Sequence, residues 1–199
     1  GTGRELTAFQ SSALIIGKEP EVIVKPDKPI LSSIGDKNIE IGSRVELTAK
    51  VTNIDSAATY TYQWFEASSK TASGTPIANA TSAKYAPATG KNGEKYYYCN
   101  VTVSKNGYTE TTTTNRAKVR VTTSLSHATI DSIAAQTYTG KGITPSVTVK
   151  YNGITLTNGT NYTVSYSNHI NPGTATVTIT GKGYYTGSRK INFTINKPA

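Results

Sequence analysis

Apolar and polar residues alternate with a period of two along most of the chain, and this pattern predicts half-buried β-strands. In the first half it is clearest over residues 43–51, 59–65 and 96–103. Each run places its apolar side chains on one face, and the first of them carries Val45, Leu47, Ala49 and Val51. Stretches rich in Ser, Gly, Asn and Lys separate the runs, as expected of turns between antiparallel strands.

A second series of alternating runs begins at His127. It comprises residues 146–156, 161–166, 174–183 and 190–195. Asn152-Gly153 between two of these strands is a strong hairpin signal, and Asn158-Gly159 and 171–173 are further turns. About six short strands in roughly 70 residues is the spacing of a small β-sandwich.

The first residues of the chain repeat a pattern found later. When residues 3–16 are set against residues 107–120, Gly3 matches Gly107, Ala13 matches Ala117 and Ile15 falls on a valine. We therefore expect residues 1–17 to be the last strand of a preceding domain of the same type. An ordinary N-terminal strand or a disordered arm is the alternative. Residues 18–29 contain three prolines and form a linker or an edge strand.

Length and composition agree with two small all-β domains. The chain has 199 residues, no Met and few Leu, while Thr, Ser, Asn, Gly and Tyr dominate between runs of Val and Ile. The predicted fold class is all-β, with two tandem β-sandwich domains over residues 18–122 and 123–199. The absence of an initiating Met, of a signal peptide and of about 20 consecutive apolar residues leads us to expect an excised piece of a longer protein, without membrane insertion in this fragment.

The single cysteine locates the first domain. The immunoglobulin pattern has a Cys on strand B, a buried Trp on strand C, and a second Cys on strand F that follows a Tyr by two residues. Here Cys99 follows Tyr97 by two, Trp64 lies in "YQWF", and Ala49 in "VELTAKV" stands where the first Cys would be. Residues 26–122 thus resemble the bacterial immunoglobulin-like repeats of cell-surface proteins.

This resemblance implies structural roles for four residues and departs from the family at two points. Trp64, Tyr97, Cys99 and Ala49 are expected in the core, with the tyrosine hydroxyl tying strand F to a corner and Cys99 as a buried thiol that acts as a small hydrophobe. Ala49 removes the disulfide, which for a loop of this length contributes roughly 2 to 4 kcal/mol. Gly93 lies too far from Cys99 to fit the usual run before strand F.

The second domain carries a different resemblance. "YTGKGITPSVTV", "LTNGTNYTVSYSN", "NPGTATVTITGKGYYTG" and "INFTI" resemble the YTG-type β-sandwich repeats of Gram-positive cell-surface proteins, over about residues 128–196. The family occurs in tandem near adhesive or enzymatic domains, so the resemblance implies an extracellular location, at the cell surface or secreted. It says little about a ligand.

The sequence contains no recognisable catalytic or metal-binding signature. After Ser124 the only acid is Asp131, and His127 and His169 lie near a linker and a turn. We therefore expect no enzyme activity, no cofactor and no metal. A Lys–Asn amide bond within the second domain would have only Asp131 as its acidic helper, and its existence stays open.

The charge is +9 overall, and after Ser124 six basic residues face one acid. Such a field favours anionic surroundings such as cell-wall polymers or acidic glycans, although solubility alone accounts for it. The basic residues come singly, not in clusters interleaved with aromatic residues, so nucleic acid is not an expected partner. Neighbouring domains of the parent protein are the expected partners, and we expect a monomer.

Four tyrosines are the only candidates for ligand contact. Tyr96 and Tyr98 alternate away from the core, and Tyr184 and Tyr185 lie in a Gly-rich turn. They can equally cover the sandwich or touch the neighbouring domain. We therefore expect non-catalytic spacer modules of an exported, adhesin-like surface protein that hold a distal domain away from the cell wall. The alternative is a carbohydrate-binding accessory module of a secreted glycoside hydrolase or adhesin, with polysaccharide or a host glycan or protein as partner.

Overall fold

Strands account for nearly all of the regular structure in residues 17–199, the part of the chain that the computed structural model describes. One 3-10 turn, Leu125–His127, is the single helical element of these residues. The predicted all-β class with two tandem sandwiches is confirmed. The strand expected at residues 1–17 lies, apart from Gly17, outside the described residues.

The first sandwich has one large and one small sheet. The large sheet has the order β1-β8-β6-β3-β4, with β7 also paired to β6. Its members are β1 (Lys37–Glu40), β3 (Thr59–Ala67), β4 (Thr75–Pro76), β6 (Gly93–Lys105), β7 (Tyr108–Thr113) and β8 (Ala117–Ser124). The small sheet pairs β2 (Leu47–Thr48) with β5 (Lys84–Tyr85), and a bridge from Leu31 to Val51 adds the incoming chain.

This strand order is that of an immunoglobulin-like domain. The incoming chain first contacts the small sheet at Leu31 and then crosses to the large sheet, where β1 runs parallel to β8. The strands β8, β6 and β3 follow one another in antiparallel pairs, as the last, sixth and third strands of the immunoglobulin sandwich do.

A bulge between β7 and β8 bends the last strand of the first sandwich. Asn100 pairs with Thr113 but Tyr97 pairs with Ala117, so the last strand holds one extra residue. At the bulge, the Thr114 hydroxyl accepts a hydrogen bond of 2.9 Å from the Cys99 amide, and the Thr114 amide donates to the Cys99 carbonyl. The ladder therefore continues through a side chain.

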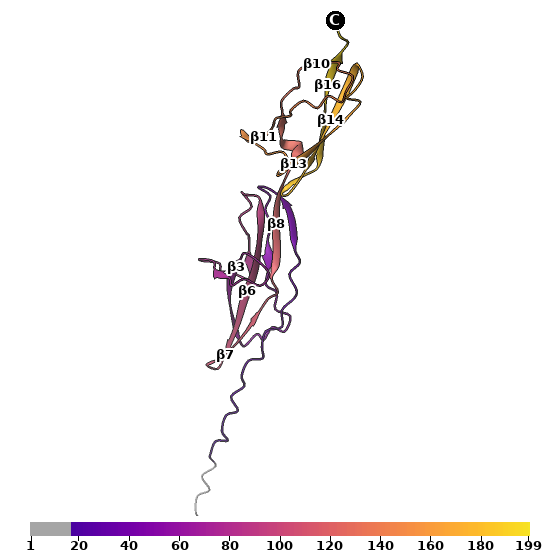
Figure 1. Cartoon of the computed structure of the whole chain (residues 1–199). Coiled ribbons are helices and arrows are strands. Elements are labelled where there is room, and N and C mark those ends of the chain that lie inside the picture. Colours follow the sequence, from indigo (N-terminus) through magenta and orange to yellow (C-terminus); the bar gives the residue numbers. More distant parts are fainter. Residues whose placement is uncertain (1–16) are drawn as a thin grey trace, which may run out of the picture.

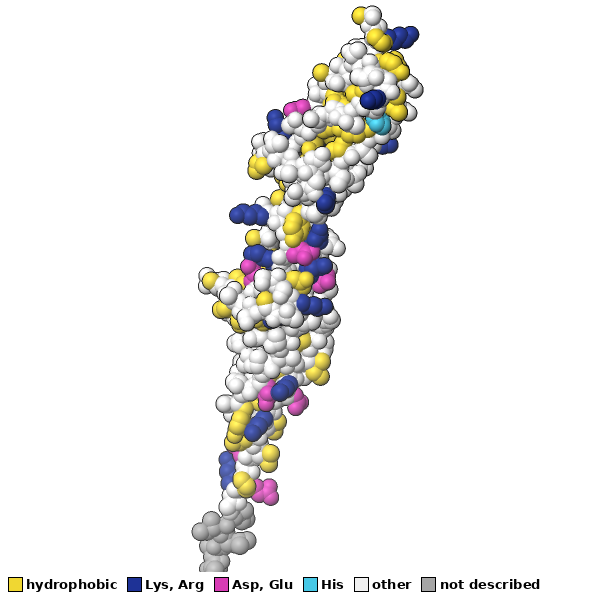
Figure 2. All heavy atoms as spheres, viewed as in Figure 1, with side chains coloured by type: hydrophobic (Ala, Val, Ile, Leu, Met, Phe, Trp, Pro, Cys, Tyr) yellow, Lys and Arg dark blue, Asp and Glu magenta, His cyan; other side chains and the backbone are white. Residues whose placement is uncertain are grey.

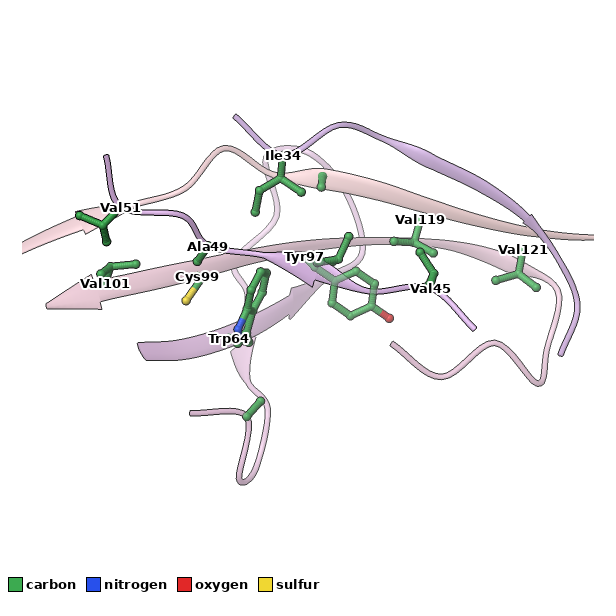
Figure 3. Packing of buried hydrophobic residues seen from close by; sticks show 13 residues of the cluster. Ile34, Val45, Ala49, Val51, Trp64, Tyr97, Cys99, Val101, Val119 and Val121 are labelled. Atoms are coloured by element: carbon green, nitrogen blue, oxygen red, sulfur yellow. The ribbon is translucent and has the colours of Figure 1, made fainter. Parts of the chain in front are cut away.

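The first core lies between these two sheets, and Figure 3 shows its residues. Trp64 and Cys99 are fully buried, and Ala49 lies with them on the facing side of the core. Trp64 donates its indole N–H to the Ser82 carbonyl over 2.8 Å, which satisfies its one polar group. The buried members of the core are Ile34, Val45, Leu47, Ala49, Val51, Trp64, Ala80, Tyr97, Cys99, Val101, Ala117, Val119 and Val121.

The second sandwich is smaller and is likewise built from two sheets. One sheet has the order β10-β16-β14-β13 and the other β12-β11-β9. The members are β9 (Thr129–Ile130), β10 (Gln136–Thr137), β11 (Val149–Tyr151), β12 (Ile154–Thr155), β13 (Tyr162–Ser167), β14 (Gly173–Gly181) and β16 (Ser188–Asn196). As in the first sandwich, an early strand, β10, lies parallel to the last strand. Asn152-Gly153 forms the predicted hairpin, with φ of 47° and 76°.

A separate core fills the second sandwich. Its buried members are Leu125, Ala128, Ile143, Val149, Leu156, Tyr162, Ala175, Val177, Ile179, Phe193 and Ile195. The two sandwiches follow each other end to end, so the described part of the chain is elongated (Figure 1). The extended residues before the first sandwich and the C-terminus lie at opposite ends of the rod.

Candidate functional site: the joint between the two sandwiches

The last strand of the first sandwich is also part of the second. Beyond its pairing with β6, β8 runs on and pairs in parallel with the short strand β15 (Tyr185–Thr186) of the second sandwich. Thr123 lies opposite Tyr185, and its amide donates a hydrogen bond of 2.8 Å to the Tyr184 carbonyl. Figure 1 shows β8 extending to the second sandwich without an intervening loop. The two units thus share backbone hydrogen bonds.

The residue after β8 is buried in the core of the second sandwich. Ser124 caps the short 3-10 turn, and Leu125, the first residue of that turn, is only 1% exposed. Arg189 of β16 donates hydrogen bonds to the carbonyls of Leu125 and Ala128, over 3.1 and 2.9 Å. The side chain and the backbone of the connection are therefore both held, and rotation about it would expose Leu125.

Arg120 connects the two sandwiches through its side chain. One of its nitrogens donates to Glu94 of β6 over 2.6 Å, and another donates to the Gly183 carbonyl over 2.7 Å. Its guanidinium lies 4.7 Å from the centre of the Tyr184 ring. Because the Arg120 side chain is only 30% exposed, these contacts are shielded in part from solvent.

The turn that receives Arg120 depends on glycine. Gly183 and Gly187 have φ of 66° and 78°, which favour glycine. At Gly181 a Cβ atom would lie 2.5 Å from the Tyr185 carbonyl oxygen, so the chain can fold back this tightly only without a side chain. The Gly-rich motif of the second domain thus shapes the surface that contacts the first.

Two further polar groups fix the end of β8. A carboxylate oxygen of Glu40, in β1, accepts a hydrogen bond of 2.8 Å from the Ser124 amide and lies 4.0 Å from the His127 ring nitrogen. The buried Thr123 hydroxyl donates to Asn92 over 2.8 Å. The first sandwich thus contributes β1, the residues around Asn92 and the end of β8 to the joint.

The structure places two of the four candidate ligand tyrosines at this joint. Tyr184 is 37% exposed and lies against Arg120. Tyr185 pairs with β8 through its backbone, while its ring packs on the second core and burial raises the pKa of its hydroxyl. The sequence left open whether these two tyrosines contact a ligand, cover their own sandwich or touch the neighbouring domain. In the structure both contact the neighbouring domain.

Tyr96 and Tyr98 lie on the outer face of β6. The Tyr98 ring stacks on Phe65, with centres 5.0 Å apart, and the Arg116 guanidinium lies 4.6 Å from its centre. Arg116 also donates to the carbonyls of Ser69 and Ala72 in the loop after β3. Tyr98 is therefore already covered by protein groups, and Tyr96 beside it is half-buried.

The four residues with expected structural roles lie in the first core, but the role expected of the Tyr97 hydroxyl is wrong. Burial raises the pKa of the Cys99 thiol to about 11 and also raises the pKa of Tyr97. The Tyr97 hydroxyl does not tie a corner; it lies 3.4 Å from a carboxylate oxygen of Glu66 on β3. The reason is that β6 begins at Gly93, which places Tyr97 well inside the strand.

The described residues offer few groups for chemistry. Asp131, the expected helper of a Lys–Asn bond, is half exposed and lies 3.7 Å from the Lys150 amine. A hollow of about 440 Å³ at the end of the first sandwich is lined by Tyr97, Val119, Val121 and residues 90–95. Its carboxylate, Glu94, is paired with Arg120. Among the described residues no three His, Cys, Asp or Glu side chains cluster as metal ligands would, and no helix has the length and apolar character of a membrane span.

Comparison with known proteins adds little to this picture. No family model matches the chain, and no curated protein matches it. Among solved structures, the titin Ig tandem domains A164-A165 align over 85% of this chain and 96% of that chain, at 10% identity and a TM-score of 0.33. The strand order described above, rather than this likeness, defines the chain as two β-sandwiches in tandem, of which the first is immunoglobulin-like.

Proposed function

We propose that the chain is a rigid, non-catalytic spacer of an exported bacterial cell-surface protein, and that it holds a distal functional domain away from the cell wall. The single observation that carries the proposal is the joint, in which β8 serves both sandwiches. Domains in series usually move relative to one another unless their interface is large and apolar. Here three different kinds of contact oppose that motion at one short connection.

Each contact restrains a different motion. The β8–β15 hydrogen bonds oppose separation of the two sandwiches, and burial of Leu125 opposes rotation about the connection. Arg120 binds both Glu94 and the Gly183 carbonyl, which opposes bending on that side. A spacer needs this stiffness, because a flexible joint would let the distal domain fold back toward the surface.

The bacterial and cell-surface parts of the proposal come from sequence resemblance. Residues 26–122 resemble bacterial immunoglobulin-like repeats, and residues 128–196 resemble YTG-type repeats of Gram-positive surface proteins. The positive charge of the second sandwich suits anionic cell-wall polymers. Adhesion through these modules is the close variant of the proposal.

Glycan binding as an accessory module is less well supported by the contacts. Rings that bind sugars present an open face, whereas Tyr184 lies under Arg120 and Tyr98 is stacked on Phe65. A glycan array probed with this chain, and with the Tyr184→Ala/Tyr185→Ala variant, is expected to give no signal for either. A signal that the double variant loses would favour the accessory module.

Replacement of the segment in its parent protein tests the spacer function. We expect two unrelated, rigidly joined β-sandwiches of equal length to restore the activity of the distal domain at the cell surface. A flexible Gly/Ser linker of the same residue number should not, because its ends lie closer together on average. If the unrelated sandwiches fail while the native segment succeeds, the chain has a binding role and the proposal is wrong.

The Arg120→Ala variant tests the stiffness itself. It loses the Gly183 and Glu94 contacts, so we expect the residual dipolar couplings of the two sandwiches to report different degrees of order. Lys118→Ala is the matched control, since Lys118 is on the same face of β8 and loses only a 4.0 Å ion pair with Glu94. Equal order in both sandwiches of Arg120→Ala would show that Arg120 does not stiffen the joint.

A further inference from the structure

Three consecutive apolar side chains lie open to solvent ahead of the first sandwich. Val22, Ile23 and Val24 are 84%, 58% and 56% exposed. They belong to an extended segment that leads away from the sandwich, with hydrophobic side chains along it (Figures 1 and 2). Nothing among the described residues covers them. Single exposed apolar residues are ordinary, but such a run is typical of a surface that a partner covers.

The segment enters the first sandwich through defined contacts with the β6–β7 turn. The Asn106 side chain donates a hydrogen bond of 2.9 Å to the Val24 carbonyl. The Lys25 amine lies 4.6 Å from the centre of the Tyr108 ring. Pro26, directly after these contacts, is buried. The entering chain is therefore held in place and does not hang freely from the sandwich.

The joint between the two sandwiches has comparable features: a cation beside a tyrosine ring of the turn, a hydrogen bond between the turn and the entering chain, and a buried residue that follows. The β14–β16 connection is equivalent to the β6–β7 turn, since each leads into the last strand of its large sheet. In the first sandwich this last strand consists of β7 and β8 together. Its Tyr184 ring lies under a cation of the entering chain, Arg120, and its Tyr184 carbonyl accepts a backbone hydrogen bond from Thr123. The residue that follows β8, Leu125, is buried.

This correspondence gives the exposed valines a position. When Pro26 is set on Leu125, a shift of 99 residues in place of the 104 that relate residues 3–16 to 107–120, Val24 falls on Thr123 and Val22 falls on Val121. Thr123 and Val121 are 1% and 5% exposed, on the face of β8 that closes the first core. Val22 and Val24 thus occupy the places of the last inward-facing residues of a sandwich whose final strand ends at Lys25.

We infer that residues 21–25 end the last strand of another immunoglobulin-like sandwich, which precedes them in the same polypeptide and docks on the β6–β7 turn. In that joint Asn106 would hold the Val24 carbonyl and Tyr108 would contact Lys25, in the way that Tyr184 contacts Thr123 and Arg120 in the joint described here. The inference rests on the proposed function only in its assumption that the modules are joined rigidly in series. It names the partner: a β-sandwich whose final strand needs Val22 and Val24 to close its core.

Hydrogen exchange in the gene product that carries this chain tests the inference. In the 199-residue chain, the amides of residues 22–24 are expected to exchange at close to the free-peptide rate. In the longer product, we expect them to exchange at least about 100-fold more slowly, as amides paired in a sheet do. Unchanged exchange in the longer product, or an encoded sequence with no alternating strands ahead of this segment, would overturn the inference.

Variants of the turn separate docking from strand formation. In the longer product, Asn106→Ala/Tyr108→Ala should keep the slow exchange of residues 22–24 but give the preceding sandwich a different degree of order from the first. Glu110→Gln, on β7 beyond the turn, is the matched control and should change neither. If the double variant leaves the order equal, the turn does not dock the preceding module and that part of the inference is wrong.

Two outcomes identify other occupants or separate this inference from the spacer proposal. Suppose that the amides of residues 22–24 are protected in the 199-residue chain and that this protection increases with protein concentration. Together with a dimer in sedimentation, this would mean that a second copy covers them. That result contradicts the partner named here. Independent motion at the Arg120 joint, with slow exchange at residues 22–24 in the longer product, would instead refute the rigid spacer and leave the docked module standing.

Discussion

Restoring a cysteine at position 49 is a sharp test of how the first core is built. Ala49, directly after β2 of the small sheet, and Cys99, on β6 of the large sheet, are buried in the same core, and both lie beside Trp64 (Figure 3). The Ala49→Cys variant should therefore form a disulfide with Cys99 across the sandwich. The protein would then contain the link between sheets that its sequence lacks.

The size of the effect follows from the loop that the bond closes. Positions 49 and 99 enclose a loop of about 50 residues, for which the chain-entropy relation gives a stabilisation of about 4 kcal/mol. Part of this gain will be lost to strain, so we expect a net increase of roughly 2 to 4 kcal/mol. A change of this size corresponds to a factor of about 30 to 1,000 in the folding equilibrium.

Urea unfolding followed by fluorescence provides the assay, because Trp64 is the only tryptophan and reports on this sandwich. Burial raises the pKa of the Cys99 thiol to about 11, which slows oxidation in the folded state. The variant should therefore be refolded under oxidising conditions and its bond verified by mass spectrometry. The same sample with reductant gives the stability without the bond.

The double variant Ala49→Cys/Cys99→Ala serves as control, since it adds the same atoms at position 49 but cannot form the bond. We expect its stability to be insensitive to reductant. If the single variant refolds without a bond, or if the bond lowers the stability, then Ala49 and Cys99 do not face each other and the assignment of strands to the two sheets is wrong.

Three further predictions concern the same sandwich. Trp64→Phe removes the indole N–H that binds the Ser82 carbonyl and should lower the free energy of unfolding by about 1 to 3 kcal/mol, measured by circular dichroism; an unchanged stability would place the indole outside the core. Thr114→Val leaves the buried Cys99 amide without its acceptor and should cost about 1 to 3 kcal/mol, whereas Thr113→Val on the exposed face should cost less than about 0.5 kcal/mol. Because the folded pKa of Cys99, about 11, lies above the ordinary value of 9.0, its contribution to stability is complete below pH 9.0 and is lost as the pH rises through about 11. The stability difference between the natural chain and Cys99→Ala should therefore change in favour of the variant over that range, and a constant difference would contradict the burial of the thiol.

The sequence predicts the apolar faces of the first sandwich better than it predicts the hydrogen-bonded strands. Val45, Leu47, Ala49 and Val51 alternate as expected and are all buried, yet only Leu47–Thr48 pairs as a strand. The alternation of apolar residues reflects which side chains are buried. The number of hydrogen-bonded residues depends instead on how far the neighbouring strand extends beside them. The partner here, β5, has only two residues.

The Tyr97 hydroxyl shows where a family pattern exceeds what its residues determine. The spacing of Tyr97 to Cys99 fits a tyrosine corner, but that role also requires the strand to begin near the tyrosine. Here β6 begins four residues earlier, at Gly93, so the hydroxyl reaches Glu66 on the neighbouring strand. The missed signal was the distance of Gly93 from Cys99, which already departed from the family pattern.

The joint could not be derived from the sequence, because its contacts combine residues that are about 60 positions apart. Arg120 is one of several basic residues that alternate to the outside of a strand, and nothing local distinguishes it from Lys118. The glycines around Tyr184 and Tyr185 indicated a tight turn but not what the turn touches. A parallel pairing of only two residues, β15 on β8, leaves no periodic pattern to detect.

The measurement that tests the central claim most directly is a set of residual dipolar couplings from the natural chain in one alignment medium. The claim is that the joint around Arg120 and Leu125 makes the two sandwiches one rigid rod. It predicts a single alignment tensor that fits the amides of residues 30–124 and 129–196 together. Two tensors of clearly different magnitude would show independent motion of the sandwiches and contradict it.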